Sequence, residues 1–231
     1  MALYDRDYAN ESLQTSETDA KIARSLFIKK TYQLFAASLL AGSVGAYVGL
    51  GAAYLFTSWF YIGCVAAYFA LLFGVHAAKK VNGLNYVLLF AFTFMSGFVI
   101  TPFLGWFLQM PAGASIVINA FVLTTVAFGA LSIFAMNTKK DFSAWGKFLF
   151  IALAVLVASI VINIFNPNPL LYNIISVAGT ILFSMFILYD TQNIIKGAYE
   201  TPIEGAISLY LDVLNLFIFI LRILGIFSSD E

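Results

Sequence analysis

The chain has 231 residues, of which 61% are hydrophobic and only 10% are charged. Soluble domains carry about 25% charged residues, so this chain has too few charges to cover a water-exposed surface, and the bilayer is expected to be its solvent. Its 12 basic and 12 acidic residues cancel, which gives no indication of a nucleic-acid partner. The single Cys64 excludes an intrachain disulfide or a thiolate cluster, and the single His76 excludes a multi-histidine metal site. No resident cofactor is expected.

The N-terminal segment, residues 1–28, is polar and mixed in charge. No short apolar stretch with a small-residue cleavage site follows it, so it does not read as a secretory signal. We interpret it as a cytoplasmic tail, followed by a single transmembrane domain over residues 29–231. Within this region "AKIARSLFIKK", Ala20 to Lys30, could form a short helix that lies on the inner membrane surface.

Three long runs without Asp, Glu, Lys or Arg follow the tail: Thr31 to Ala78, Val81 to Thr138 and Phe148 to Tyr189. A membrane-crossing helix needs about 20 apolar residues, so each run is long enough for two crossings. Glycine and proline mark a turn inside each run. These turns are predicted at Gly49 to Trp59, Gln109 to Gly113 and Asn166 to Pro169.

A seventh segment, Ile203 to Phe227, is also long enough to cross, although it carries Glu204, Asp212 and Arg222. The predicted fold is therefore an all-α integral membrane protein, a bundle of seven transmembrane helices. A seventh segment that dips into the membrane and returns is an alternative that the sequence leaves open.

Positive charges lie on one side of the predicted bundle. Every lysine and arginine except Arg222 falls in the N-terminal segment or in a loop that the hairpin pattern places on the same side. Because positively charged loops stay in the cytoplasm, we expect the N-terminus and these loops to be cytoplasmic. These residues are Arg6, Lys21, Arg24, Lys29, Lys30, Lys79, Lys80, Lys139, Lys140, Lys147 and Lys196.

Small residues recur at every fourth position of the first span: Ala37, Ala41, Gly45, Gly49 and Ala53. Such a stripe allows another helix to approach closely. We expect the partner to be a helix of the same bundle, and a homodimer face is the alternative.

Two aspartates lie inside predicted spans, where an ionisable group costs roughly 2.5–3.5 kcal/mol on insertion scales. A rise of 1.5 Å per residue places Asp190 about 9 Å from Lys196 and Asp212 about 12 Å from Glu204. The two carboxyl groups should therefore lie at similar depth on neighbouring helices. Each aspartate is followed at i+3, on the same helix face, by an amide, Asn193 or Asn215.

Two carboxylates about 4 Å apart repel by about 4 kcal/mol at an effective dielectric constant of about 20. Desolvation also disfavours the charged forms, so we expect Asp190 and Asp212 to share one proton near neutral pH and to titrate as a pair. A hard cation such as Ca²⁺ is the alternative guest, because two carboxylates and the carbonyls of Asn193 and Asn215 supply part of its oxygen shell. The competing interpretation is structural: one or both aspartates cap a helix end or form hydrogen bonds within the bundle.

Two further ionisable residues are auxiliary candidates. Arg222 lies about 15 Å along the helix from Asp212, so it is expected to extend to the outer surface, with pairing to Asp212 as the alternative. His76 is expected at the inner membrane interface, with contact to the proton of the aspartate pair as the alternative.

The segments "FILYDTQNIIKG", Phe186 to Gly197, and "AISLYLDVLNLFIFILRILG", Ala206 to Gly225, resemble the C-terminal signature of the Bax inhibitor-1 family. The resemblance covers roughly Thr31 to Gly225. It implies a bundle of seven helices in which the last is central, and a pH-sensitive calcium leak across the membrane, here the inner membrane of a bacterium. In that family two aspartates of the last two helices form the pH sensor, and they match Asp190 and Asp212.

The chain departs from the family pattern in its second span. Channel-forming members use an arginine there as a latch, whereas this span has only His76 near its inner end. A bacterial branch of the family is linked instead to restraint of a membrane-bound AAA protease, which is a second interpretation. Intramembrane aspartyl proteases also pair two aspartates, but they carry Gly-x-Gly-Asp, and this chain has Leu-Tyr-Leu-Asp at Leu209 to Asp212. An enzyme is therefore not expected.

Overall fold

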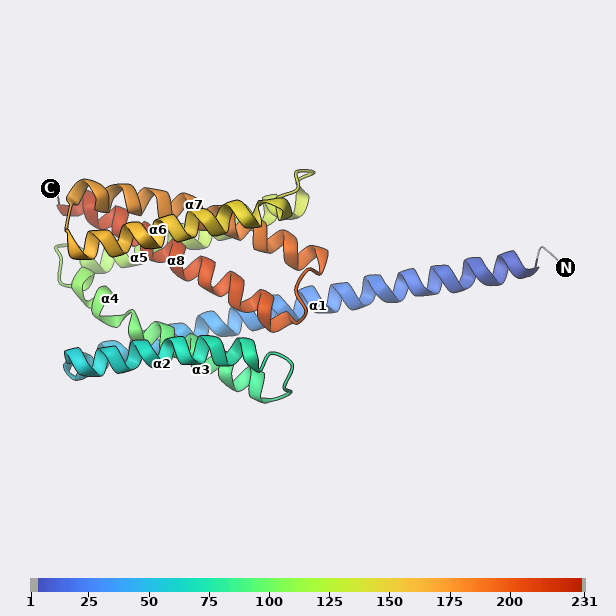
Figure 1. Ribbon diagram of the computed structural model, residues 1–231, viewed down its shortest axis with the longest axis horizontal. Helices are drawn as coiled ribbons and strands as arrows, with labels where there is room; N and C mark the ends of the chain where they lie inside the picture. Colours follow the sequence, from blue (N-terminus) through green and yellow to red (C-terminus); the bar gives the residue numbers. More distant parts are fainter. Residues whose placement is uncertain (1–3, 230–231) are drawn as a thin grey trace.

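The computed structural model describes the backbone of residues 4–229 and the side chains of residues 18–228. Its described part consists of α-helices and two short 3₁₀ helices, arranged as an elongated bundle (Figure 1). The elements are α1 (Tyr4–Gly51), η1 (Ala53–Leu55), α2 (Ser58–Ala77), α3 (Leu84–Val99), α4 (Thr101–Leu108), α5 (Gly113–Asn137), η2 (Ser143–Trp145), α6 (Gly146–Phe165), α7 (Pro169–Lys196) and α8 (Pro202–Ser229).

Seven helical segments of the described chain are long and apolar enough to cross a membrane. Six of them form the three predicted hairpins, and the connections after Gly51, Leu108 and Phe165 fall where glycine and proline predicted turns. The seventh, α8, is unbroken over its whole length, so the segment crosses the bundle and does not dip and return. The prediction of an all-α bundle of seven spans is therefore confirmed.

The third span is divided into α3 and α4, a break that the sequence analysis did not predict. Pro102 stands at the start of α4, where its missing N–H and its ring prevent the regular bonding of a continuing helix. The change of direction has a structural consequence. In Figure 1, α4 carries the chain from the layer of α2 and α3 to the layer of α5, α6 and α7.

Helix α8 is central, as predicted. It packs against α1, α3, α5 and α7, and in Figure 1 it crosses between the two layers of helices. Its buried side chains contribute to all three apolar clusters of the core. Ile207 belongs to the cluster with α1 and α3, Leu216 to the cluster with α6 and α7, and Leu221 to the cluster with α4 and α5. Any polar group on α8 is thereby placed in the middle of the bundle.

The small-residue stripe of the first span packs within the bundle, against α3. A Cβ atom at Gly45 would overlap the backbone of Phe94, and one at Gly49 would overlap Thr101. On the facing helix, a Cβ atom at Gly97 would overlap the backbone of Gly42. The two backbones approach closely because these residues have no side chain. The last member of the predicted stripe, Ala53, lies beyond α1 in η1.

The N-terminal segment is part of the first spanning helix. Helix α1 begins at Tyr4 and continues without a break to Gly51, and in Figure 1 it extends far beyond the other helices. The suggestion of a separate surface helix at Ala20 to Lys30 is therefore wrong. Phe27 and Ile28 pack against the core cluster of α1, α3 and α8, so this stretch joins the bundle. The proposed domain boundary at residue 28 falls inside the helix.

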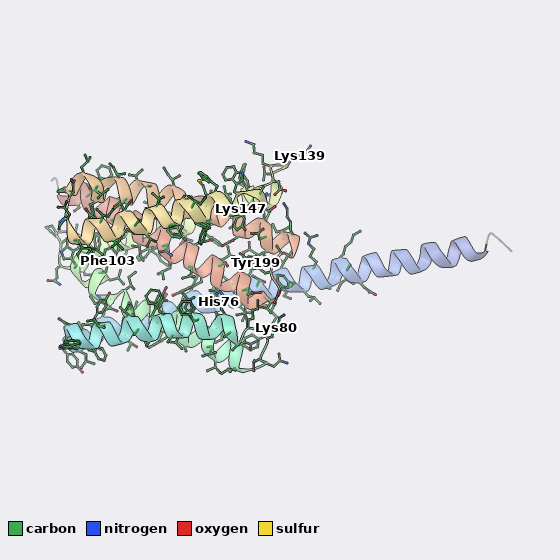
Figure 2. The ribbon with its side chains drawn as sticks, viewed as in Figure 1. His76, Lys80, Phe103, Lys139, Lys147 and Tyr199 are labelled. Atoms are coloured by element: carbon green, nitrogen blue, oxygen red, sulfur yellow. The ribbon has the colours of Figure 1, made fainter. Side chains whose placement is uncertain are left out.

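The lysine-bearing loops gather at one end of the bundle, which we call the lysine-rich end. Figure 2 shows Lys80 and Lys139 at this end, and Phe103 toward the opposite end. Helix α1 enters the bundle from the lysine-rich end and α8 ends at the opposite end (Figure 1). This agrees with an odd number of crossings.

Candidate functional site

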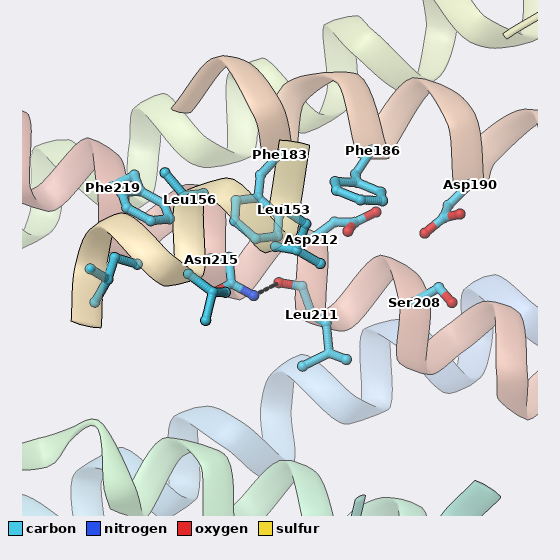
Figure 3. Close-up of a pocket in the computed structure, with 12 residues that line it drawn as sticks. Leu153, Leu156, Phe183, Phe186, Asp190, Ser208, Leu211, Asp212, Asn215 and Phe219 are labelled. Carbon is cyan, nitrogen blue, oxygen red and sulfur yellow. Dashed lines mark hydrogen bonds between the residues drawn. The ribbon is translucent and has the colours of Figure 1, made fainter. Parts of the chain in front are cut away.

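The structure brings Asp190 of α7 and Asp212 of α8 together. Figure 3 shows the two carboxyl groups pointing toward one another, and both line the same cavity. Only 6% of Asp190 and 4% of Asp212 is exposed. Two buried carboxyl groups can form a hydrogen bond to each other only if one carries a proton. The matched depth predicted from the sequence is thus realised in the fold.

A tight turn sets this juxtaposition. Gly197 ends α7 with a positive φ of 69°, and the N–H of Ala198 donates to the carbonyl of Asn193 at 2.9 Å, a Schellman ending. Helix α8 begins with a capping box. The backbone N–H of Thr201 donates to Glu204 at 3.1 Å, and that of Glu204 donates to the Thr201 hydroxyl at 3.4 Å. The short turn leaves α7 and α8 side by side.

Tyr199, in this turn, completes the site. Its hydroxyl donates to Oδ1 of Asp190 at 2.7 Å. Burial raises the pKa of Tyr199 above its ordinary value, and the neighbouring Asp190 raises it further. The hydroxyl therefore keeps its proton at neutral pH and remains a donor. The sequence analysis missed this residue. The available signal was an aromatic residue in an otherwise polar turn between two aspartate-bearing helices.

Ion pairs connect this turn to the turn between α2 and α3. Lys79 Nζ lies 3.0 Å from Glu200 and 2.7 Å from Glu204, and Lys80 Nζ lies 2.9 Å from Glu200. Lys80 and Lys79 lower the pKa of Glu200 to about 2. Since Glu200 directly follows Tyr199, these contacts, which we call the ionic clamp, join the segment that carries the tyrosine to the turn between α2 and α3.

The two asparagines have different positions. Asn193 is buried on α7 one turn after Asp190, so it lies beside the site. The amide Nδ2 of Asn215 donates to the carbonyl of Leu211 at 2.7 Å within α8, one turn from Asp212. The described residues contain no group of three or more His, Cys, Asp or Glu that could hold a metal ion. A cation at the pair would therefore depend on amide and hydroxyl oxygens in addition to the carboxylates.

The two auxiliary candidates lie away from the pair. The Arg222 guanidinium stacks over the ring of Tyr172 at 4.4 Å, and no ion pair joins it to Asp212. Its Nε is buried without a hydrogen-bond partner, so the side chain does not simply extend to the surface as expected. His76 is exposed, and its Nδ1 lies 2.9 Å from the Leu72 carbonyl. This agrees with an interfacial position.

A cavity of about 310 Å³ borders the pair. Helices α6, α7 and α8 line it, and Figure 3 shows its lining side chains. Asp190, Asp212, Ser208 and Asn215 supply the polar part of the wall. The apolar part is made by Leu153, Leu156, Val157, Ile160, Phe183, Phe186, Leu211 and Phe219.

Comparison with known proteins gives a consistent result. The family model described as "Inhibitor of apoptosis-promoting Bax1" matches residues 24–229. An uncharacterized protein of Campylobacter jejuni is 52% identical, over 99% of this chain and 100% of its own length. An uncharacterized protein of Helicobacter pylori is 44% identical over the whole of both chains. The protein named Bax inhibitor 1 of Schizosaccharomyces pombe is 33% identical, over 92% of this chain and 80% of its own.

Proposed function

The chain belongs to the Bax inhibitor-1 family, and on this premise we propose that it is a pH-sensitive calcium leak channel gated by Asp190 and Asp212. The observation that carries the proposal is the position of two carboxyl groups, each less than a tenth exposed, that point toward one another from adjacent spanning helices (Figure 3). No enzymatic family is indicated by the comparisons.

The proposed gate follows from the electrostatics of the pair. A shared proton holds α7 and α8 together at this point. When it leaves, two carboxylates at about 4 Å repel by about 4 kcal/mol at an effective dielectric constant of about 20, and either separation of the helices or arrival of a cation relieves the repulsion. Asp190, Asp212 and Asn193 offer oxygens to a passing Ca²⁺, but fewer than the six to eight of a storage site. This incomplete shell suits an ion in transit.

The other charged groups near the pair are not expected to change their protonation between pH 6 and 8. Lys79 and Lys80 face Glu200 and Glu204 in the ionic clamp, and the ion pairs of Glu200 are already formed well below neutral pH, since its pKa is about 2. Tyr199 faces Asp190 as a neutral donor. Between pH 6 and 8, the aspartate pair is therefore the group we expect to control the flux.

The test is calcium entry into proteoliposomes loaded with a fluorescent indicator, between pH 6 and 8. Wild-type flux should rise with pH as the proton leaves, and Asp190→Asn and Asp212→Asn should each remove this dependence. Asp141→Asn is the matched control, because it makes the same chemical change in an exposed loop. Flux equal to that of empty liposomes at every pH would contradict the proposal, as would unchanged pH dependence in Asp212→Asn.

We propose that the lysine-rich end faces the cytoplasm of a bacterial cell and that the membrane is the inner one. The positive charge of this end supports the orientation, and the bacterial relatives support the location. A cysteine introduced at Lys139 should be inaccessible to a membrane-impermeant thiol reagent in intact spheroplasts and accessible after permeabilisation. Labelling of intact spheroplasts would reverse the orientation.

A second candidate function is modulation of a membrane-bound AAA protease. The projection of α1 beyond the bundle favours it, because a free helical segment offers a surface to another protein (Figure 1). In this case, deletion of residues 2–17 should abolish co-purification with the protease, whereas Asp190→Asn and Asp212→Asn should leave it unchanged. Co-purification that survives the deletion would exclude a role for this segment.

A further inference from the structure

The cavity beside the aspartate pair is larger and more apolar than an inorganic cation needs. A calcium ion requires oxygen atoms at 2.3–2.6 Å and makes no use of hydrocarbon walls. The cavity of about 310 Å³ is lined by eight apolar side chains and four polar ones. Pockets for small organic molecules begin at about 300 Å³ and have this character, a mostly apolar wall with a few polar groups.

One polar atom of the cavity residues, Oδ2 of Asp212, lacks a hydrogen-bond donor. Oδ2 of Asp212 is buried and receives no hydrogen bond from an N–H or hydroxyl group of the described protein. The other carboxyl, Asp190, has Tyr199 as its donor. A buried carboxylate oxygen without a donor is destabilising, and a cationic donor is the partner that stabilises it most. A ligand with a positively charged N–H group would therefore complement Asp212 best.

The cavity is accessible from the bilayer, between α6 and α8. Helix α6 packs chiefly against α7, and the cavity fills the gap that remains between α6 and α8. Val157, on the α6 rim, is 50% exposed, and it lies in the middle of a spanning segment. A ligand would therefore enter from the bilayer, and this route favours an amphiphilic molecule.

We propose that this cavity binds a hydrophobic organic amine, with its ammonium group donating to Asp212 and its apolar body against Leu153, Leu156 and Phe183. The charge-assisted hydrogen bond supplies the donor that Oδ2 lacks, and the rings of Phe183 and Phe186 offer cation–π contact. The inference stands on the cavity and the unpartnered oxygen, and it does not require that the protein conduct calcium.

The probe for the test is dansylcadaverine, a fluorescent primary amine with an aromatic body. Its binding to the full chain in lipid nanodiscs is measured by fluorescence, with empty nanodiscs subtracted. The N-acetylated probe, which keeps the body and loses the charge, is the matched ligand control. We expect saturable binding of the amine and at least about tenfold weaker binding of the acetylated form, since the charged hydrogen bond is lost.

Two variants locate the site. Asp212→Asn removes the charge, and Val157→Trp fills the rim from the bilayer side without touching either carboxyl group. Each should weaken binding of the amine at least about tenfold, while Asp141→Asn leaves it unchanged. Equal binding of the acetylated probe, or unchanged binding to Val157→Trp, would overturn the proposal. If Asp212→Asn fails to fold, Val157→Trp and the acetylated probe still test the proposed amine site. Amine binding without calcium flux would contradict the proposed channel function and leave the amine site supported.

Discussion

The two aspartates of the pair point toward one another but have different surroundings. Asp190, at the lysine-rich end of α7, receives a hydrogen bond from Tyr199. Asp212, in the body of α8, has a buried oxygen that receives none, and it borders an apolar cavity. Hydrogen bonds to a carboxylate stabilise its negative charge, so the charge is better accommodated at Asp190. The difference assigns a role to each side: Asp190 is held in place, and Asp212 remains available to a proton or a cation.

The largest expected effect is a difference in stability between the leucine substitutions at Asp190 and at Asp212. In Asp190→Leu the Tyr199 hydroxyl loses its buried partner and Asp212 is left as an unpaired buried carboxyl group, which should cost roughly 2–5 kcal/mol of the free energy of unfolding. In Asp212→Leu the remaining Asp190 keeps Tyr199 as its donor, so the loss should be smaller than in Asp190→Leu. Thermal unfolding in one detergent, followed by circular dichroism, compares them. Equal losses in both variants would show that the surroundings do not differ energetically.

A smaller effect is expected from Tyr199→Phe, which removes only the donor to Asp190. Hydrogen bonds to charged groups contribute about 1.5–3 kcal/mol, and 1.36 kcal/mol corresponds to one pH unit, so the midpoint of the pH-dependent flux should rise by about one to two units. The sign follows because loss of a donor to the charged form favours proton retention. Tyr54→Phe, at the exposed opposite end, is the control and should leave the midpoint in place. A midpoint that falls would contradict the role of Tyr199 as a donor.

The smallest effect is expected from the ionic clamp. The pKa of Glu200 is depressed to about 2, so its ion pairs stabilise the fold above its ordinary pKa of 4.5 and are lost only as the pH falls toward 2. They are constant between pH 6 and 8, and exposed pairs contribute little. Glu200→Gln should therefore change the flux midpoint by less than about 0.3 unit. A shift as large as that of Tyr199→Phe would mean that the clamp controls the tyrosine.

The features that the sequence predicted are those with a periodic or compositional cause. The spans follow from uncharged runs, their turns from glycine and proline, and the meeting of Asp190 and Asp212 from matched distances to the nearest loop charges. Each of these depends on residues close together in the chain or on the thickness of a bilayer.

The features that were missed depend on contacts between distant segments. Tyr199 could be assigned only once the turn had folded back over Asp190, and the stacking of Arg222 on Tyr172 joins α8 to the start of α7. The break before Pro102 was overlooked because hydropathy runs through it unchanged. The continuation of α1 through the polar segment has no hydrophobic signal at all, since its helix is set by local propensity.

The proton shared by Asp190 and Asp212 can be measured most directly by infrared difference spectroscopy of the reconstituted protein between pH 6 and 8. The account predicts a carbonyl band of a protonated carboxyl group that disappears as the pH rises and is absent from both Asp190→Asn and Asp212→Asn, but present in Asp141→Asn. A wild-type spectrum without a titrating carboxyl band in this range, or a band that persists in Asp212→Asn, would contradict it.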